Sequence, residues 1–133
     1  MPTPVSLFLV DDDAALLRGL ERKLSSKAHR IAGSTTSAAT AAGLVAELRP
    51  QVVITDLEMP GFDGVAITIA IRTYGLDIPV IVYSGNVDQS AARRCIEAGA
   101  IGFVSKMLPL SDLLRAIDRA AAGKSVGIIL DVQ

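Results

Sequence analysis

The sequence predicts a single α/β domain built on a doubly wound parallel sheet, with helices covering both faces. Short apolar runs of strand length alternate with longer stretches of helical period, which is the pattern of βα units joined by right-handed crossovers. Most of the short runs are apolar throughout rather than alternating, as expected of strands that are buried on both faces. The length of 133 residues favours one folding unit.

The first half of the chain carries three expected strands and two expected helices. The strands are short apolar runs, of which the second is the weakest, at Val5–Val10, His29–Gly33 and Val52–Thr55. The helices that follow the first two strands are marked by apolar stripes at helical spacing, namely Leu16, Leu17, Leu20 and Leu24, then Ala38, Ala42, Val45 and Leu48.

The second half continues the same alternation. Two further strands are expected at Val80–Tyr83 and Gly102–Val104, and three further helices at Val65–Thr73, Gln89–Ala98 and Leu110–Ala122. A glycine follows each of these helices, at Gly75, Gly99 and Gly123. Because glycine is the usual residue just past a helix end, these positions set the expected boundaries.

Composition and charge exclude several classes of function. Thirteen basic and fourteen acidic residues leave a net charge of −1, without the basic excess of a domain that binds nucleic acid directly. The single cysteine, Cys95, allows no internal disulfide and lies at core spacing beside Ala92 and Ile96. No apolar stretch reaches the ~18 residues of a membrane span, and residues 1–4 lack the parts of a signal peptide. We therefore expect a cytoplasmic protein that contacts no membrane.

Polar residues follow the expected strands and indicate a site. Asp11 and Asp12 end the first strand, Asp56 the third and Ser84 the fourth, and Lys106 follows the fifth. The carboxyl ends of parallel strands share one edge of the sheet, where ligands bind in this class of fold. Clustered carboxylates repel one another unless a cation binds them, and Mg²⁺ prefers oxygen ligands. The sequence therefore predicts a magnesium site that contains a nucleophilic aspartate.

Four segments in this order resemble the receiver domain of two-component response regulators. They are Val10-Asp-Asp-Asp13, Asp56-Leu-Glu-Met-Pro-Gly-Phe-Asp-Gly64, Pro79-Val-Ile-Val-Tyr-Ser-Gly85 and Ala98-Gly-Ala-Ile-Gly-Phe-Val-Ser-Lys106. The resemblance covers about residues 5–123 and implies a flavodoxin-like sheet of five strands in the order 2-1-3-4-5. It implies a receiver domain at residues 1–123, with residues 124–133 as a tail or the start of a linker.

The resemblance also implies a role for each site residue. Asp56 would accept a phosphoryl group from a sensor histidine kinase or phosphotransfer protein. Mg²⁺ would be held by Asp12, Asp56 and the backbone carbonyl of Glu58, with Asp11 acting mainly through metal-bound water. Lys106 and the Ser84 hydroxyl would contact the phosphoryl group. Such a protein assists its own phosphorylation and dephosphorylation and is not a turnover enzyme.

Further residues are assigned by the same resemblance. Ser84 and Phe103 would form the switch that reshapes the face of the fourth helix, fifth strand and fifth helix. Glu58 and Asn86 would flank the approach of water and so tune the lifetime of the phosphoryl group. Met107 stands where receivers commonly have proline, which argues against a cis peptide bond after Lys106.

The segment Lys106–Ile117 resembles receivers that precede a helix-turn-helix output domain, so the output is expected to be transcription. A stand-alone regulator is the other reading of the same chain. The switch face could also support a homodimer.

Plainer or rival readings accompany these assignments. Asp13 is expected to cap the first helix and Asp63 and Gly64 to form the turn into the third, while His29 is expected to be structural or on the surface. Two rival functions stay open. One is a small phosphatase with Asp56 as nucleophile and Glu58 as acid, and the other is a receiver-like binding module that does not depend on phosphorylation.

Overall fold

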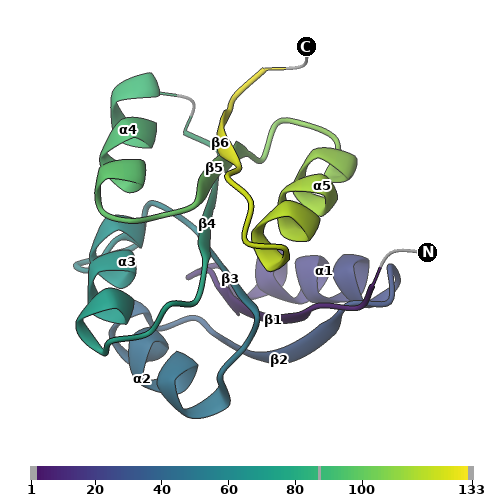
Figure 1. Cartoon of the computed structure of the whole chain (residues 1–133), viewed down its shortest axis with the longest axis horizontal. Coiled ribbons are helices and arrows are strands. Elements are labelled where there is room, and N and C mark those ends of the chain that lie inside the picture. Colours follow the sequence, from purple (N-terminus) through teal and green to yellow (C-terminus); the bar gives the residue numbers. More distant parts are fainter. Residues whose placement is uncertain (1–2, 87, 132–133) are drawn as a thin grey trace.

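The computed structural model describes residues 3–86 and 88–131. Strands and helices alternate along this part of the chain, as Figure 1 shows. The elements in order are β1 Ser6–Val10, α1 Ala14–Ser25, β2 Arg30–Thr35, α2 Ala38–Leu48, β3 Val52–Thr55, α3 Gly64–Thr73, β4 Val80–Ser84, α4 Gln89–Glu97, β5 Gly102–Ser105, α5 Leu110–Ala121 and β6 Gly127–Ile129.

All strands of the sheet are parallel, in the order β2-β1-β3-β4-β5-β6. The predicted fold and the predicted order of its five strands are confirmed. The sixth strand, β6, was not predicted, and it comes from the segment that was expected to be a tail or linker. Residues 132–133 of that segment lie outside the described residues.

Helices cover both faces of the sheet (Figure 1). On one face α1 and α5 pack a cluster that includes Leu24, Leu113 and Ile117 against β1, β3 and β4. On the other face α2 and α3 bury Val45 and Ile67 against the sheet, and α4 lies against β5. Burial on both faces explains why the central strands read as continuous apolar runs.

For two residues the predicted burial on the inner stripe of a helix is wrong. Leu16 is 56% exposed, because α1 turns its Leu17 and Leu24 into the core and successive helical residues point about 100° apart. Leu48 is 43% exposed, because it is the last residue of α2 and the chain leaves the helix through Arg49, whose φ of 52° is left-handed. The predicted ends of the five strands and of the last three helices lie within two residues of the observed ends.

Several residues have the structural roles that were expected of them. Asp13 caps α1 by accepting hydrogen bonds from the amides of Ala15 and Leu16, at 3.0 and 3.1 Å. Asp63, which was expected in the turn into the third helix, caps α3 by accepting a hydrogen bond from the Ala66 amide at 3.0 Å. His29 is buried, and its Nδ1 accepts a hydrogen bond from the amide of Val5 at 3.1 Å, so its role is structural. Within the described residues no helix is both long and apolar enough to span a bilayer.

Candidate functional site

Three carboxylates meet at the carboxyl edge of the sheet. β1 and β3 are neighbouring strands, so Asp11 and Asp12 after β1 come close to Asp56 after β3. One carboxylate oxygen from each of these residues lies within 4.8 Å of the others. The amide of Asp56 donates to the carbonyl of Val10 at 2.9 Å, which ties the two strand ends together. The convergence predicted from the strand pattern is thus present in the structure.

Lys106 reaches this acidic cluster from β5. Its Nζ lies 2.9 Å from Oδ2 of Asp11 and 3.4 Å from Oδ2 of Asp56, although 95 positions separate Asp11 from Lys106 in the sequence. The same ammonium lies 5.9 Å from the centre of the Tyr83 ring, an arrangement that favours the cation. The ammonium group therefore bridges the two acids that end β1 and β3.

The site changes the proton affinity of its members. Burial is the main cause that raises the pKa of Asp56, and the charge of Asp11 adds to it, while Lys106 and the Leu57 amide oppose the rise. Burial by itself lowers the pKa of Lys106. The hydrogen bond to Asp11 and the charges of Asp56 and Asp11 outweigh burial, so the pKa of Lys106 is raised overall. Lys106 therefore stays an ammonium at neutral pH.

The raised pKa of Asp56 predicts a gain of stability in Asp56→Asn. A carboxyl whose folded pKa is above its unfolded value destabilises the fold when charged, so this cost is present above the folded pKa and absent below the ordinary value of 3.8. We expect Asp56→Asn to raise Tm at pH 7 without Mg²⁺, and the gain to vanish as the pH falls below 3.8. Thermal melts across pH, with the exposed Asp77→Asn as control, would contradict this if both variants behaved alike.

The loop after Asp56 holds its carboxylate and leaves no space for a side chain behind it. Oδ1 of Asp56 accepts a hydrogen bond from the Leu57 amide at 2.8 Å. Gly64, at the start of α3, packs against the same loop, and a Cβ there would lie 2.6 Å from the carbonyl oxygen of Asp56. The sequence identified Gly64 only as a turn residue. Its actual constraint is the close approach of two backbones, which no local pattern reveals.

The other predicted site residues lie at the same edge of the sheet. Ser84 ends β4 opposite Ser105, is buried, and accepts a hydrogen bond from the Asn86 amide at 3.0 Å through its hydroxyl. Asn86 in turn accepts from the Asp88 amide, and Glu58 is exposed. Phe103 of β5 is fully buried against α4. The Lys106–Met107 peptide bond is trans, as Met107 in place of proline predicts.

The residues at this edge fit a divalent cation. Their donors are carboxylate oxygens, which Mg²⁺ prefers, and Asp12 is exposed, so that water can complete a coordination shell. One ammonium also cannot neutralise three carboxylates. The acidic cluster could therefore bind a metal ion. Asp13 lies outside it, because its side chain is used by the helix cap.

Asp12 and Asp13 should separate metal binding from stability. We expect Asp13→Ala to lower the free energy of unfolding by about 1 kcal/mol through loss of the cap, while added Mg²⁺ still raises Tm as in the wild type. Asp12→Ala should do the reverse and abolish most of the rise in Tm with Mg²⁺. Thermal melts over a Mg²⁺ titration test both, and an equal response of the two variants would contradict the assignment.

Two features of the site were missed by sequence reasoning. Tyr83 lies beside Lys106. Leu16 and Met107, the residue that follows Lys106, are 56% and 78% exposed. A cavity of about 300 Å³ between α1 and the β5–α5 loop is lined by Leu16, Tyr83 and Leu108 together with Asp11 and Lys106. Apolar residues in a helix pattern are ordinarily assigned to the core, so nothing in the sequence marked Leu16 as part of a surface.

Comparisons with known proteins agree with this fold and this site. Residues 7–118 match the family described as the response regulator receiver domain. The chain is 31% identical over 120 residues to the C4-dicarboxylate transport transcriptional regulatory protein DctD of Rhizobium meliloti, which covers 90% of this chain and 26% of DctD. It is 29% identical over 126 residues to the probable transcriptional regulatory protein NarL of Mycobacterium tuberculosis, covering 94% of this chain and 58% of NarL.

Solved structures agree. The signal receiver domain of NarL from Mycobacterium tuberculosis superposes with a TM-score of 0.85 at 28% identity, covering 92% of this chain and all of that domain. The chain thus spans between about a quarter and three fifths of the length of these curated relatives. Fold, site and family match coincide over the same residues, and the chain belongs to the family of response regulator receiver domains of two-component systems.

Proposed function

We propose that this domain accepts a phosphoryl group on Asp56 from the phosphohistidine of a sensor kinase or phosphotransfer protein. The observation that carries the proposal is the position of Lys106. Its ammonium lies 3.4 Å from Asp56, within a cluster of three carboxylates that fits a divalent cation. A nucleophile, a fixed cation and a metal site in one place are the parts that phosphoryl transfer needs.

The reaction is an in-line displacement at phosphorus. A carboxylate oxygen of Asp56 forms the new P–O bond as the P–N bond of the phosphohistidine breaks. The bonding electron pair stays with the imidazole ring, which takes up a proton from water and leaves as a neutral group. The product is an acyl phosphate. Lys106 neutralises charge on the phosphoryl oxygens, and the Leu57 amide holds the attacking carboxylate in place. Ser84 and the amides after Asp56 and Ser84 complete the cradle.

Asp12, Asp56 and the backbone carbonyl of Glu58 would hold Mg²⁺, with Asp11 acting mainly through metal-bound water. When bound, Mg²⁺ supplies positive charge that offsets the repulsion between the carboxylates and the incoming phosphoryl group. Asp11 has a second task in the protein itself, because its hydrogen bond at 2.9 Å positions the ammonium of Lys106. Neither task makes the domain a turnover enzyme.

The exposed side chains beside the site suit the approach of a protein partner. Leu16 of α1 and Met107 after β5 are large apolar groups in water. Exposed apolar groups beside a reactive centre favour contact with another protein. The kinase is the partner that must reach Asp56.

Because curated relatives such as DctD and NarL are named as transcriptional regulatory proteins, we assign the output to control of transcription.

Ser84 and Phe103 are the residues through which phosphorylation would change the protein surface. Ser84 lies at the end of β4, and Phe103 packs in the cluster between β5 and α4. A new charge on Asp56 that draws the Ser84 hydroxyl would shift the population of arrangements of this cluster. The affected face is formed by α4, β5 and α5.

The decisive experiment is incubation with acetyl phosphate and Mg²⁺, read by intact mass. We expect the wild type to gain one phosphoryl group, with acetate as the leaving group, and Asp56→Asn to gain none. No gain in the wild type would overturn the proposal and support a binding module that does not depend on phosphorylation. Sustained hydrolysis of an aryl phosphate, rather than one stoichiometric acyl phosphate, would instead support a phosphatase.

Glu58 and Asn86 are expected to set how long the phosphoryl group lasts. Each lies two residues beyond a site residue, where water would approach the acyl phosphate. We expect Glu58→Ala and Asn86→Ala still to be phosphorylated but to lose the group at a changed rate. Decay of the phosphorylated mass after removal of acetyl phosphate measures this. Unchanged decay in both variants would refute the assignment.

A further inference from the structure

The edge of β5 has a place prepared for β6. Gly102, the first residue of β5, has no side chain where Val126 packs, and a Cβ at Gly102 would lie only 2.6 Å from Cβ of Val126. Gly127 has a φ of 78°, in the left-handed region that glycine adopts readily. Gly102 and Gly127 are partners in the strand register, so the pairing of β6 with β5 begins where neither strand has a side chain.

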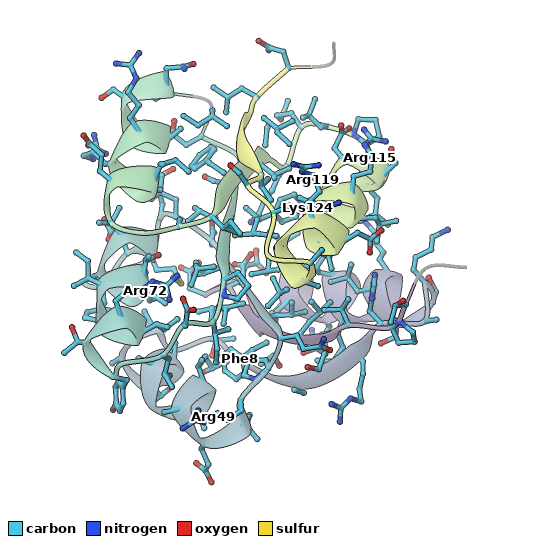
Figure 2. All side chains as sticks on the ribbon, viewed as in Figure 1. Phe8, Arg49, Arg72, Arg115, Arg119 and Lys124 are labelled. Atoms are coloured by element: carbon cyan, nitrogen blue, oxygen red, sulfur yellow. The ribbon has the colours of Figure 1, made fainter. Side chains whose placement is uncertain are left out.

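Hydrogen bonds hold the turn that brings the chain back from α5. Nε of Arg119 donates to the carbonyl of Ser125 at 2.8 Å, and the Lys124 amide donates to the carbonyl of Arg119 at 2.9 Å. The amides of Val126 and Gly127 both donate to the carbonyl of Ile101. Figure 2 labels Arg119 and Lys124, whose side chains lie beside α5. The return of this segment is therefore a defined structure.

β6 lies between α4 and α5 (Figure 1) and pairs with β5, the strand that carries the proposed switch residue Phe103. Ile128 is paired with Phe103 in the register, and Ile128 and Leu130 pack on the cluster that contains Phe103 and Cys95. Ile129 packs on the cluster of the opposite face. Because β6 is parallel to β5, its carboxyl end lies at the same edge of the sheet as Asp56.

This strand is also a weakly held part of the sheet. It has three residues, all half-buried, and it pairs with one strand only. Short edge strands with few buried contacts open by local unfolding at a much lower cost than the core strands. β6 is therefore the strand of this sheet whose docking we expect to respond most readily to a change in β5.

β5 connects this strand to the phosphorylation site. Phe103 precedes Lys106 by three residues, Ser105 is paired with Ser84, and the Lys106 amide donates to the Ser84 carbonyl at 2.8 Å. We propose that docking of β6 on β5 is coupled to phosphorylation of Asp56, so that residues 126–130 are held more tightly in the phosphorylated protein. The proposal rests on the proposed function.

The physical basis is a saving of conformational entropy. Lys106 already contacts Asp11 and Asp56 before phosphorylation, and a phosphoryl group on Asp56 adds anionic oxygens that hold the ammonium, and with it the carboxyl end of β5, more tightly. A β5 strand that is already ordered lowers the entropy that β6 loses on pairing, so the two events favour each other without a large structural change. Coupling between two sites is reciprocal, so β6 in turn strengthens the binding of a phosphoryl mimic by the same factor.

Hydrogen exchange of the full chain tests the coupling directly. Beryllofluoride with Mg²⁺ serves as the phosphoryl mimic, and a ¹⁹F spectrum reports whether it is bound. We expect the amides of residues 126–130 to exchange about fivefold or more slowly when the mimic is bound, at the lower end of typical couplings. Asp56→Asn should show no such change.

Gly102→Ala provides the reciprocal measurement, because its Cβ displaces Val126 and undocks β6. It should bind beryllofluoride more weakly by the factor found in the exchange experiment, and Val126→Gly in the same chain should restore part of the loss. Bound mimic with unchanged or faster exchange at residues 126–130 would overturn the coupling alone. Absence of bound mimic in the wild type would overturn the proposed function together with it.

Discussion

Lys106→Met is expected to lower the rate of phosphorylation by acetyl phosphate by about 100-fold or more. A fixed cation aimed at developing charge is worth on the order of 100- to 1,000-fold in rate when a single donor is removed. Lys106 is such a cation, with its ammonium 2.9 Å from Asp11 and 3.4 Å from Asp56. Methionine keeps much of the length and apolar stem of the side chain and removes the charge together with the hydrogen bond to Asp11.

The same variant should bind Mg²⁺ at least as tightly as the wild type. Removal of the ammonium leaves the three carboxylates more strongly in need of a cation. The measurements are the initial rate of mass gain and the rise of Tm with Mg²⁺. Lys27→Met, which changes an exposed lysine far from the site in sequence, is the matched control. Equal loss of Mg²⁺ binding and phosphorylation would contradict a specific role for the ammonium.

Gly64→Ala is expected to reduce phosphorylation as strongly, although Gly64 carries no reactive group. Its Cβ would lie 2.6 Å from the carbonyl oxygen of Asp56 and 3.1 Å from Cα of Leu57. Both contacts are with backbone, so the loop that orients the carboxylate has to move. Overpacking of this kind costs about 1–3 kcal/mol of stability, and a displacement of the nucleophile by about 1 Å costs on the order of 100-fold in rate.

Gly19→Ala is the control for this substitution. Gly19 lies within α1, and a Cβ there meets nothing within 4 Å. Alanine at this position should raise the free energy of unfolding by up to about 1 kcal/mol, because glycine is a poor helix former. Denaturant unfolding and the initial rate of mass gain compare the two variants. A Gly64→Ala protein with wild-type rate and stability would show that the loop adapts at no cost.

Much of this fold could be predicted because its local and long-range signals agree. The strands at 52–55 and 80–84 are buried on both faces, so their composition alone marks them. The caps at Asp13 and Asp63 and the left-handed glycines at 75, 99 and 123 mark the helix ends. The site was predictable for a related reason, since the polar residues that end parallel strands meet at one edge.

The errors come from places where a local pattern does not decide which side of an element is covered. Leu16 and Leu17 are adjacent residues of the same type, yet only Leu17 faces the core. β6 escaped prediction because a three-residue strand with an initial glycine has no recognisable period. β6 can pair with β5 only because Gly102, in β5, has no side chain where Val126 packs. A pattern within residues 127–129 cannot reveal this.

The sequence by itself determined the fold class, the helix ends and the set of acids, hydroxyl and ammonium at the carboxyl edge, because each follows from periodicity, capping chemistry or strand order. The tertiary structure alone decided that Lys106 bridges Asp11 and Asp56 and that the position of Gly64 has no room for a side chain. It also decided that β6 pairs with β5 at the edge of the sheet, with Ile128 opposite Phe103. These features are distances between segments far apart in the chain, and such distances exist only once the core has packed.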